Sequence, residues 1–280
     1  MAKKASHNHI IRKFVASARA LALPVTFLIL LASTLSIVMV TYYFSVERLN
    51  SQSQDLQVSA SKQNFVSLDN VILSTMGQPG SSETLDLTDS GGLTNIQPSA
   101  NVLTITANDN SSIDETIFNS SVGQLNYELP SSSSIETGLY LAGDSQTITN
   151  QTGASSSQLF LTETLQGPEI QLQYRPTVTY VAYVLDNGQA VTDIRIYLVN
   201  LNSSDPINSQ GELPLQISCT GTQLTTQTYF VSAQSESLTI TSVLNGASGS
   251  VSIPIATTSQ GSQINVETVI SNVSIQRWIR

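Results

Sequence analysis

The most regular pattern in this chain is an uninterrupted apolar run near its N-terminus. Residues 21–44 read LALPVTFLILLASTLSIVMVTYYF and contain no charged side chain. A helix rises about 1.5 Å per residue, so this run extends roughly 36 Å and can cross a hydrocarbon core of about 30 Å. The apolar region of a secretory signal peptide is shorter, about 7–15 residues. We therefore predict a transmembrane helix over residues 21–44.

Beyond this run the apolar positions become sparser but keep a helical period. Residues 45–75 contain neither Gly nor Pro, and apolar residues recur with the loose spacing of one helical face. The series is Val46, Leu49, Leu56, Phe65, Leu68, Ile72 and Met76. Gly77 and Pro79 then end the helix. The pattern predicts one continuous helix from about Ala20 to about Met76, roughly 85 Å long.

The second half of this helix, residues 45–77, is predicted to be amphipathic. An apolar stripe with polar flanks needs a surface that buries it, so we expect Leu68 and Ile72 to pack against the rest of the protein. Leu56, which lies nearer the apolar run, is expected to matter much less. The alternative is a helix that ends near Leu49 and continues as a polar stalk.

From residue 81 onwards the period of the apolar positions changes to two. The alternating segments are 102–106, 169–174, 194–198, 213–217, 238–240 and 251–255. Turn signals occur at 186–188, 209–211, 245–246 and 248–249. Short alternating segments between such turns are typical of antiparallel strands in a sandwich or barrel. The expected fold class is α+β: a long N-terminal helix whose first half spans the membrane, followed by an antiparallel all-β, sandwich-like head over residues 81–280.

Four features refine this expectation for the head. Pro214 and Pro254 fall in alternating segments, which favours edge strands or bulges. The serines at 155–157 indicate an exposed loop. Cys219 is the only cysteine, so no intrachain disulfide can form, and its apolar flanks predict a buried thiol on a strand.

Charge is distributed very unequally on the two sides of the apolar run. Five basic residues and no acidic one precede the run: Lys3, Lys4, Arg12, Lys13 and Arg19. After residue 44 there are six basic and 20 acidic residues, so that part has a net charge of −14. Basic residues beside a membrane span stay on the cytoplasmic side. We therefore predict a basic cytoplasmic leader, residues 1–20, and a single span that places the rest of the chain outside the cell. A buried core helix would give no reason for this asymmetry.

The residue types present argue against catalysis and against nucleic-acid binding. A part with a net charge of −14 repels nucleic acid. The only histidines, His7 and His9, precede the span, so the head has no histidine for a nucleophile-base pair or a metal. The segment 143–145 (Gly-Asp-Ser) weakly resembles a hydrolase serine motif but is interpreted as a turn. Paired carboxylates could serve a glycosidase, but no spacing of acidic residues, including the adjacent pair at 114–115, identifies an acid and a base. We expect no enzyme activity, no cofactor and no small-molecule substrate.

Two further patterns concern surface chemistry. The segment that contains Asp109 and Asp114 has the highest density of oxygen ligands in the chain, so weak Ca²⁺ binding there is an open question. The segment lacks the residue spacing of an EF-hand, which favours a solvated acidic loop. Five sequons are candidate glycosylation sites: Asn110, Asn119, Asn150, Asn202 and Asn272. The predicted orientation places all five outside the cell, but their number is close to what the Asn, Ser and Thr content gives by chance.

The order of parts resembles a family. A basic leader, the triplet Arg19-Ala20-Leu21 before the apolar run, a long helix and a β-rich head are together similar to archaeal type IV pilin-like proteins with class III signal peptides. The resemblance covers the N-terminal 80 residues or so. It implies that a prepilin peptidase cuts between Ala20 and Leu21. The family usually has Glu at the fifth mature position for subunit docking, where this chain has Val25 after Pro24.

Two function hypotheses follow from these patterns. The first is a membrane-anchored cell-surface structural protein, a pilin-like subunit or minor pilin, which self-associates or assembles with similar subunits. The second is a permanently anchored envelope or adhesion protein whose β head binds a protein or a glycan. The mature N-terminus separates them, because a free Leu21 favours the first and an intact leader favours the second.

Overall fold

The computed structural model describes residues 5–109, 111–130, 136–151, 153–231, 236–259 and 261–279, with side chains from Pro24 onwards. The chain divides into two compact units, Met1–Gln54 and Asp55–Arg280. One helix, α1 (Ala5–Thr75), includes residues of both units, and all the strands belong to the second. The predicted α+β class, a long N-terminal helix before a sandwich-like β domain, is confirmed.

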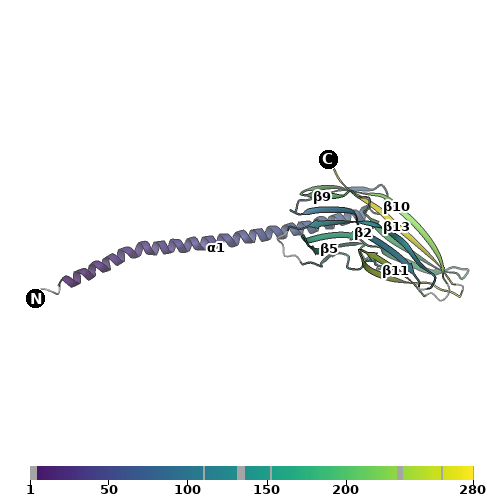
Figure 1. Ribbon diagram of the computed structural model, residues 1–280, viewed down its shortest axis with the longest axis horizontal. Helices are drawn as coiled ribbons and strands as arrows, with labels where there is room; N and C mark the ends of the chain where they lie inside the picture. Colours follow the sequence, from purple (N-terminus) through teal and green to yellow (C-terminus); the bar gives the residue numbers. More distant parts are fainter. Residues whose placement is uncertain are drawn as a thin grey trace. The chain divides into compact units, whose positions relative to one another are not determined.

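The helix α1 is continuous over 71 residues (Figure 1), and it begins at Ala5, so the predicted start near Ala20 is wrong. Pro24 lies inside it and does not interrupt it. It ends where the sequence predicts, because Gly77 takes a φ of 78° that residues with a Cβ rarely adopt. The Met76 amide still donates to the Ile72 carbonyl, at 3.0 Å. The alternative of a helix ending near Leu49 is therefore wrong.

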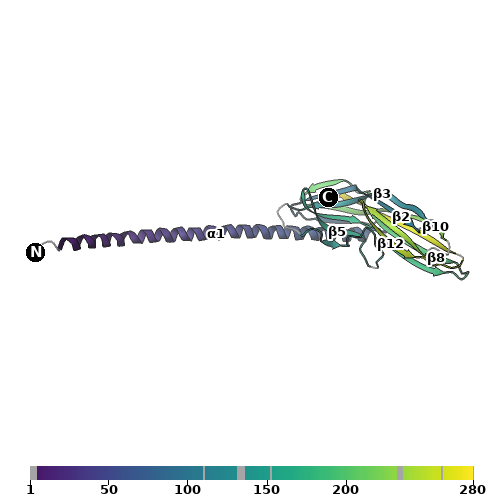
Figure 2. The same cartoon turned by 60° about the horizontal axis from the view of Figure 1, so that its bottom comes forward.

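The strands form two sheets, which Figures 1 and 2 show in two views. The first has five strands in the order β1 (Ser82–Leu87), β10 (Leu213–Val231), β13 (Ser262–Arg277), β8 (Ala190–Asn200) and β7 (Thr177–Val184). The second has the order β12 (Ala247–Pro254), β11 (Ser237–Leu244), β2 (Leu93–Asn108), β3 (Asp114–Glu128), β6 (Gly167–Tyr174), β5 (Ser157–Thr164) and β4 (Tyr140–Ala142). A further strand, β9 (Ile207–Gln210), pairs with β2.

Among the named strands of the described residues, pairing is antiparallel with one exception. β13 runs parallel to β8, from the pair Ser262–Ala190 to the pair Asn272–Asn200. The prediction of an all-antiparallel domain is therefore wrong at this pair. Alternation could not reveal it, because a strand buried on one face has the same period of two in either direction.

A two-residue turn joins β11 to β12. Asn245 and Gly246 both have positive φ, 52° and 80°, as a two-residue type I′ hairpin requires. The predicted turn at 245–246 is thus confirmed. The neighbouring prediction at 248–249 is wrong, because the chain has already reversed and these residues pair within β12.

The predictions for single residues of the domain had mixed outcomes. Pro254 is the last residue of β12, an edge strand, as predicted. Pro214 lies in β10, which has a neighbour on each side, so the edge prediction is wrong there. It is tolerated because it is the second residue of its strand and lies before the β13 ladder, which begins at Leu215. Cys219 is 1% exposed on β10, so the predicted buried thiol is confirmed.

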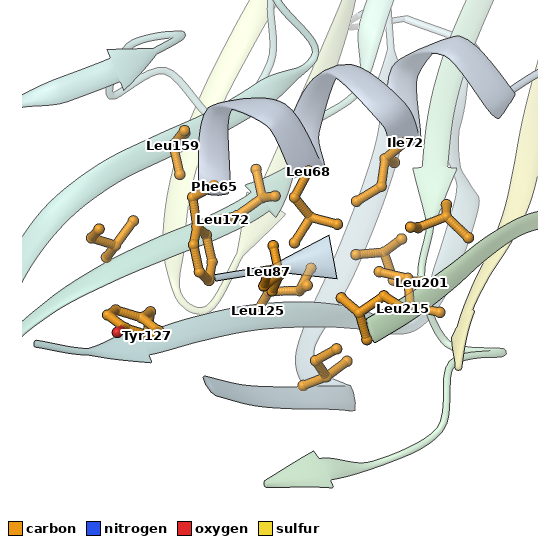
Figure 3. Packing of buried hydrophobic residues seen from close by; sticks show 14 of the residues in the cluster. Phe65, Leu68, Ile72, Leu87, Leu125, Tyr127, Leu159, Leu172, Leu201 and Leu215 are labelled. Carbon is orange, nitrogen blue, oxygen red and sulfur yellow. The ribbon is translucent and has the colours of Figure 1, made fainter. Parts of the chain in front are cut away.

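Two hydrophobic clusters stabilise the second unit. The helix core consists of Val58, Phe65, Leu68 and Ile72 of α1 with buried residues of both sheets, contributed by β1, β2, β3, β5, β6, β8, β9, β10 and β13. Figure 3 shows its helical side chains pointing toward the strands. The sheet core lies between the two sheets and has no helical member. One end of the sandwich is thus closed around α1 and the other by strands alone.

Candidate functional site

The N-terminal part of α1 is apolar on every side. From Pro24 it is long and apolar enough to cross a membrane by length and composition, with a mean hydropathy of 2.1 in its most apolar window and none of that window buried. The large apolar side chains between Val25 and Phe44 are 44–71% exposed. A helix without a polar face cannot be explained by packing on one surface. An apolar surface all round is typical of a membrane span or of a fully buried core helix.

The hydroxyl groups in this part of α1 bond back to their own helix. Ser33 donates to the Leu30 carbonyl at 2.9 Å, and Ser36 donates to Ala32 at the same distance. Thr34, Thr41 and Ser45 bond to carbonyls three or four residues earlier in the same way. In a hydrocarbon environment each of these polar atoms would otherwise lack a partner. The apolar part of α1 is therefore compatible with lipid despite its Ser and Thr content.

The C-terminal part of α1 has the opposite character. Phe65, Leu68 and Ile72 are at most 1% exposed within the helix core, whereas Leu56 is 70% exposed. The Phe65 ring packs against that of Tyr127 with centroids 5.7 Å apart. The prediction that Leu68 and Ile72 pack against the β domain is confirmed.

A buried polar group, which the sequence analysis did not identify, fixes this part of the helix to the sheet. Asp69 is 4% exposed, beside Leu68 on the buried face of α1. Its carboxylate accepts a hydrogen bond from the Ser157 hydroxyl at 2.8 Å and another from the Tyr174 hydroxyl at 2.8 Å. The bonds join α1 to the neighbouring strands β5 and β6. One sequence signal could have identified Asp69: it is an acidic residue at a position where the apolar stripe of the helix predicts an apolar one.

Burial controls the charge of this group. Desolvation raises the pKa of Asp69 above its ordinary value, and the two hydrogen bonds oppose that shift without cancelling it. Desolvation also raises the pKa of Tyr174 well above its ordinary value, and the neighbouring Asp69 adds to the effect. Ser157 is fully buried at the start of β5, so the predicted exposed loop at 155–157 is wrong at this residue.

A second buried polar group, the Arg175 side chain, binds the segment between β4 and β5. The Arg175 side chain is fully buried and forms an ion pair with Asp144, whose side chain is 49% exposed. Arg175 also donates to the carbonyls of Gln146 and Ser155, at 2.8 Å and 3.1 Å. The hydrogen bond from Arg175 lowers the pKa of Asp144. Gly143 has a positive φ of 73°, which agrees with the predicted turn at 143–145. Asp144 in this turn belongs to the ion pair with Arg175.

The predicted acidic loop is organised by one of its own side chains. Asp109 is only 6% exposed, and its carboxylate accepts hydrogen bonds from the amides of Ser111, Ser112 and Ile113. Burial raises its pKa, but the hydrogen bond from the Ser111 hydroxyl and those from the three amides outweigh burial and hold the pKa below its ordinary value. The carboxylate therefore shapes a turn. Among the described residues, no three His, Cys, Asp or Glu side chains lie close enough together to hold a metal.

The other predicted site residues do not form one cluster. Asn119, Asn150 and Asn202 are exposed, Asn272 is half-buried on β13, and Asn110 lies outside the described residues. Arg19, Ala20 and Leu21 are in α1, and their side chains are also outside the described part. Glycosylation and leader cleavage stay predictions.

The outer face of the five-stranded sheet carries a hollow of about 530 Å³. Its polar lining is contributed by Asp193 and Arg195 of β8, Thr226 of β10, and Asn265 and Glu267 of β13. These side chains bond to one another: Arg195 pairs with Glu267, and Asn265 donates to Asp193 at 2.8 Å. Thr179, Tyr180 and Val181 of β7 line it as well. Local sequence patterns do not predict this hollow, because its residues come from four strands.

Comparisons with models of protein families, with curated proteins and with solved structures found no match to this chain. The function is therefore argued from the residues described above.

Proposed function

We propose that this chain is a single-pass membrane-anchored structural protein of the cell surface, and that it acts as a pilin-like subunit. The observation that carries the proposal is the division of α1. One uninterrupted helix has an apolar part that is exposed on every side, followed by a part whose apolar stripe is buried in a β domain. A lipid bilayer would surround the apolar side chains of the first part, and the β domain buries the apolar stripe of the second.

The charge distribution supports an orientation for this anchor. The basic leader, residues 1–20, stays in the cytoplasm, and the acidic part after residue 44 lies outside the cell. Tyr42 and Tyr43 lie at the C-terminal end of the apolar run, where an interfacial aromatic belt is expected. The resemblance to class III signal peptides then assigns cleavage between Ala20 and Leu21.

Self-association of the anchor would rest on packing rather than on charge. Val25 occupies the position where the family usually has Glu, so a charged docking contact is missing from the apolar run. Small residues let helix backbones approach closely, and Ala32, Ser33 and Ser36 lie within four residues along the apolar part. The hydroxyls of Ser33 and Ser36 are already satisfied within α1, which leaves these residues available for close packing.

The direct test is the mature N-terminus of protein isolated from native membranes. We expect a chain that begins at Leu21, lighter than the precursor by about 2 kDa, given 30.0 kDa over 280 residues. Ala20→Leu places a bulky side chain at the cut and should leave the precursor intact. Ala16→Leu makes the same change four residues earlier and should be processed normally. A wild-type chain that keeps residues 1–20 would contradict the pilin-like assignment.

One observation favours a second candidate, a permanently anchored envelope or adhesion protein. The hollow on the outer face of the five-stranded sheet offers Asp193, Arg195 and Asn265 beside exposed Tyr197, groups that can hydrogen-bond and stack on a glycan or a peptide. An intact leader together with a ligand whose binding is lost in Asn265→Ala would select this candidate. The anchor itself is common to both.

A further inference from the structure

The hollow on the outer face of the five-stranded sheet has a polar floor that the strand register sets. Asp193 of β8 lies beside Asn265 of β13, and two residues further along Arg195 lies beside Glu267. Thr226 of β10 continues the second row on the other side of Glu267. Alternate residues of a strand share one face, so all five side chains line the same space. Its volume of about 530 Å³ lies within the range of about 300–1,000 Å³ that ligand sites occupy.

Apolar and aromatic side chains border this floor on the same face of the sheet. In the row beyond Asp193 and Asn265, the register places Tyr183 at the β7 end and Phe230 at the β10 end. In the row beyond Arg195 and Glu267, it places Tyr197 and Leu224. All four of these bordering side chains are exposed. The hollow therefore combines hydrogen-bonding groups at its centre with apolar surface around them.

The polar side chains of the floor hold one another in place. The Asp193 carboxylate accepts hydrogen bonds from the Tyr183 hydroxyl at 3.0 Å and from the Asn265 amide at 2.8 Å. In the second row, Arg195 forms an ion pair with Glu267. Side chains that are already fixed lose little conformational freedom when a ligand binds. The floor is thus preorganised for binding.

These bonds leave part of the hydrogen-bonding capacity of the floor unused. Glu267 meets Arg195 through its Oε2 atom, and no other described residue bonds to its Oε1 atom. The Thr226 hydroxyl also has no partner within the described ranges. Arg195 donates from Nε to Glu267 and from Nη1 to the Tyr197 hydroxyl, at 3.4 Å in the second case, although a guanidinium has five N–H donors. A ligand in the hollow therefore meets both donors and acceptors.

Two classes of ligand fit this lining poorly. The floor strands β8 and β13 each have a paired strand on both sides, so a peptide finds no open backbone there and cannot bind as an added strand. An anion is disfavoured because the floor contains two carboxylates and only one guanidinium, which is already paired. The net charge of −14 after residue 44 acts in the same direction.

We propose that this hollow binds a neutral glycan. Each sugar hydroxyl both donates and accepts a hydrogen bond, which matches the mixed donors and acceptors of the floor. The C–H faces of a pyranose ring are apolar and can pack on the aromatic rings of Tyr183 and Tyr197, which border the floor. The inference rests on the second candidate function given above, since both use the hollow as a binding site. It does not depend on leader cleavage and holds equally for a pilin-like subunit.

Binding of the full-length chain to immobilised oligosaccharides tests this inference. The chain is kept in a detergent without a sugar headgroup, which would compete for the site. The probes are neutral oligosaccharides of hexoses and N-acetylhexosamines, the same oligosaccharides carrying a sialic or uronic acid, and uncharged, acidic and basic peptides. We expect at least one neutral oligosaccharide to bind at least about tenfold more tightly than its acidic counterpart and than any peptide.

The same probes separate failure of this inference from failure of the second candidate function. Binding of a peptide alone, lost in Asn265→Ala, would overturn the glycan assignment and keep the adhesion candidate. Preferred binding of acidic oligosaccharides would also overturn the inference. Binding of no probe at all would overturn the inference and remove the observation that favours the adhesion candidate.

Two variants place the glycan in the hollow. Arg195→Ala and Asn265→Ala each remove hydrogen-bonding groups from the floor and should weaken binding of the neutral oligosaccharide about tenfold. Asn208→Ala removes an exposed amide from β9, outside the hollow, and should bind like wild type. Urea unfolding checks that each variant is folded, and the Arg195 side chain is 52% exposed, so Arg195→Ala keeps the test valid if Asn265→Ala unfolds. Undiminished binding in Arg195→Ala and in folded Asn265→Ala would overturn the proposal.

A charge variant tests why the glycan is neutral. Glu267→Gln keeps the size of the side chain, removes one negative charge from the floor and leaves Arg195 without its charged partner. It should narrow the preference for the neutral oligosaccharide over its acidic counterpart. Glu163→Gln makes the same change at an exposed position of β5, on the other sheet, and should leave the preference unchanged. An equal preference in wild type and Glu267→Gln would contradict the proposal that the charge of this floor selects a neutral ligand.

Discussion

The two parts of α1 are made from similar apolar residues and yet have opposite surroundings. Between Val25 and Phe44 the large apolar side chains lie on every side of the helix and are exposed, whereas Phe65, Leu68 and Ile72 form one stripe and are buried. The amount of apolar surface does not distinguish the two parts as clearly as its angular distribution does. A stripe can be covered by a folded domain, while an apolar surface all round is typical of a membrane span or of a fully buried core helix.

The energetic consequences of the two arrangements also differ. Full burial of a side chain such as Leu68 stabilises the folded domain by about 1.5–3 kcal/mol. The apolar part contributes no such term to the β domain, because none of its described side chains belongs to the helix core. We therefore expect substitutions in the buried stripe to change the free energy of unfolding, and substitutions in the apolar run to change only membrane association.

The largest effect is expected at Phe65. Phe65→Ala removes a ring that is 1% exposed and should lower the free energy of unfolding by about 3–5 kcal/mol. Urea unfolding of the full chain in detergent, followed by near-ultraviolet circular dichroism, measures this change. Leu56→Ala is the matched control in the same helix and should stay within about 0.5 kcal/mol of wild type. Equal effects at the two positions would mean that α1 is only a tether.

The next effect concerns the apolar run. Leu35→Arg should make insertion of the helix less favourable by about 2.5–3.5 kcal/mol, because it places a charge in the hydrocarbon core. The fraction of protein that stays with membranes after alkaline washing should fall, while the urea midpoint of the β domain stays at the wild-type value. Leu56→Arg is the control and should not change membrane retention. A shifted urea midpoint in Leu35→Arg would break the separation between the two parts.

A smaller effect is expected at the buried carboxylate. Asp69→Ala leaves the hydroxyls of Ser157 and Tyr174 without their partner and should destabilise the domain by about 1–3 kcal/mol. Asp69→Asn keeps the shape and an oxygen acceptor and should cost less. The same urea titration compares the two variants. If Asp69→Asn is as destabilising as Asp69→Ala, charge rather than hydrogen bonding holds the helix in place.

The smallest effect is a pH dependence that belongs to Asp69. Its pKa is higher in the folded chain than the ordinary 3.8, so the folded state binds more protons in the window between the two values. The stability from this group is fully present below pH 3.8 and is lost as the pH rises through the folded pKa. Relative to Asp69→Asn, wild type should lose stability as the pH rises above 3.8. A difference in the free energy of unfolding between the two chains that does not change with pH would show that the pKa of Asp69 is not shifted by folding.

Much of the fold could be predicted because its signals are local. The apolar run, the stripe that contains Leu68 and Ile72, and the stop at Gly77 each depend on neighbouring residues, and the structure has all three. The turn at Asn245-Gly246 is equally local, since it needs two adjacent residues that tolerate positive φ. Alternation located segments of six strands, β2, β6, β8, β10, β11 and β12, because one buried face is enough to produce it.

The features that were missed depend on residues far apart in the sequence. Asp69 meets Ser157 and Tyr174 only after α1 has packed on β5 and β6, so a run of serines looked like a loop. The parallel pairing of β8 with β13 and the hollow on the outer sheet face have the same origin. Family resemblance reached only the N-terminal 80 residues or so and therefore said nothing about these sites.

The most direct measurement of the central claim is the accessibility of spin labels along α1 in lipid bilayers. Single cysteines at Leu35 and Leu56 would carry the label, and the buried Cys219 stays unlabelled in the folded chain. Power saturation compares the relaxation of each label by oxygen, which partitions into lipid, with that by a water-soluble nickel chelate. We expect the label at Leu35 to respond to oxygen and the label at Leu56 to respond to nickel. A nickel response at both positions would contradict the account, because the apolar part of α1 would then lie in water.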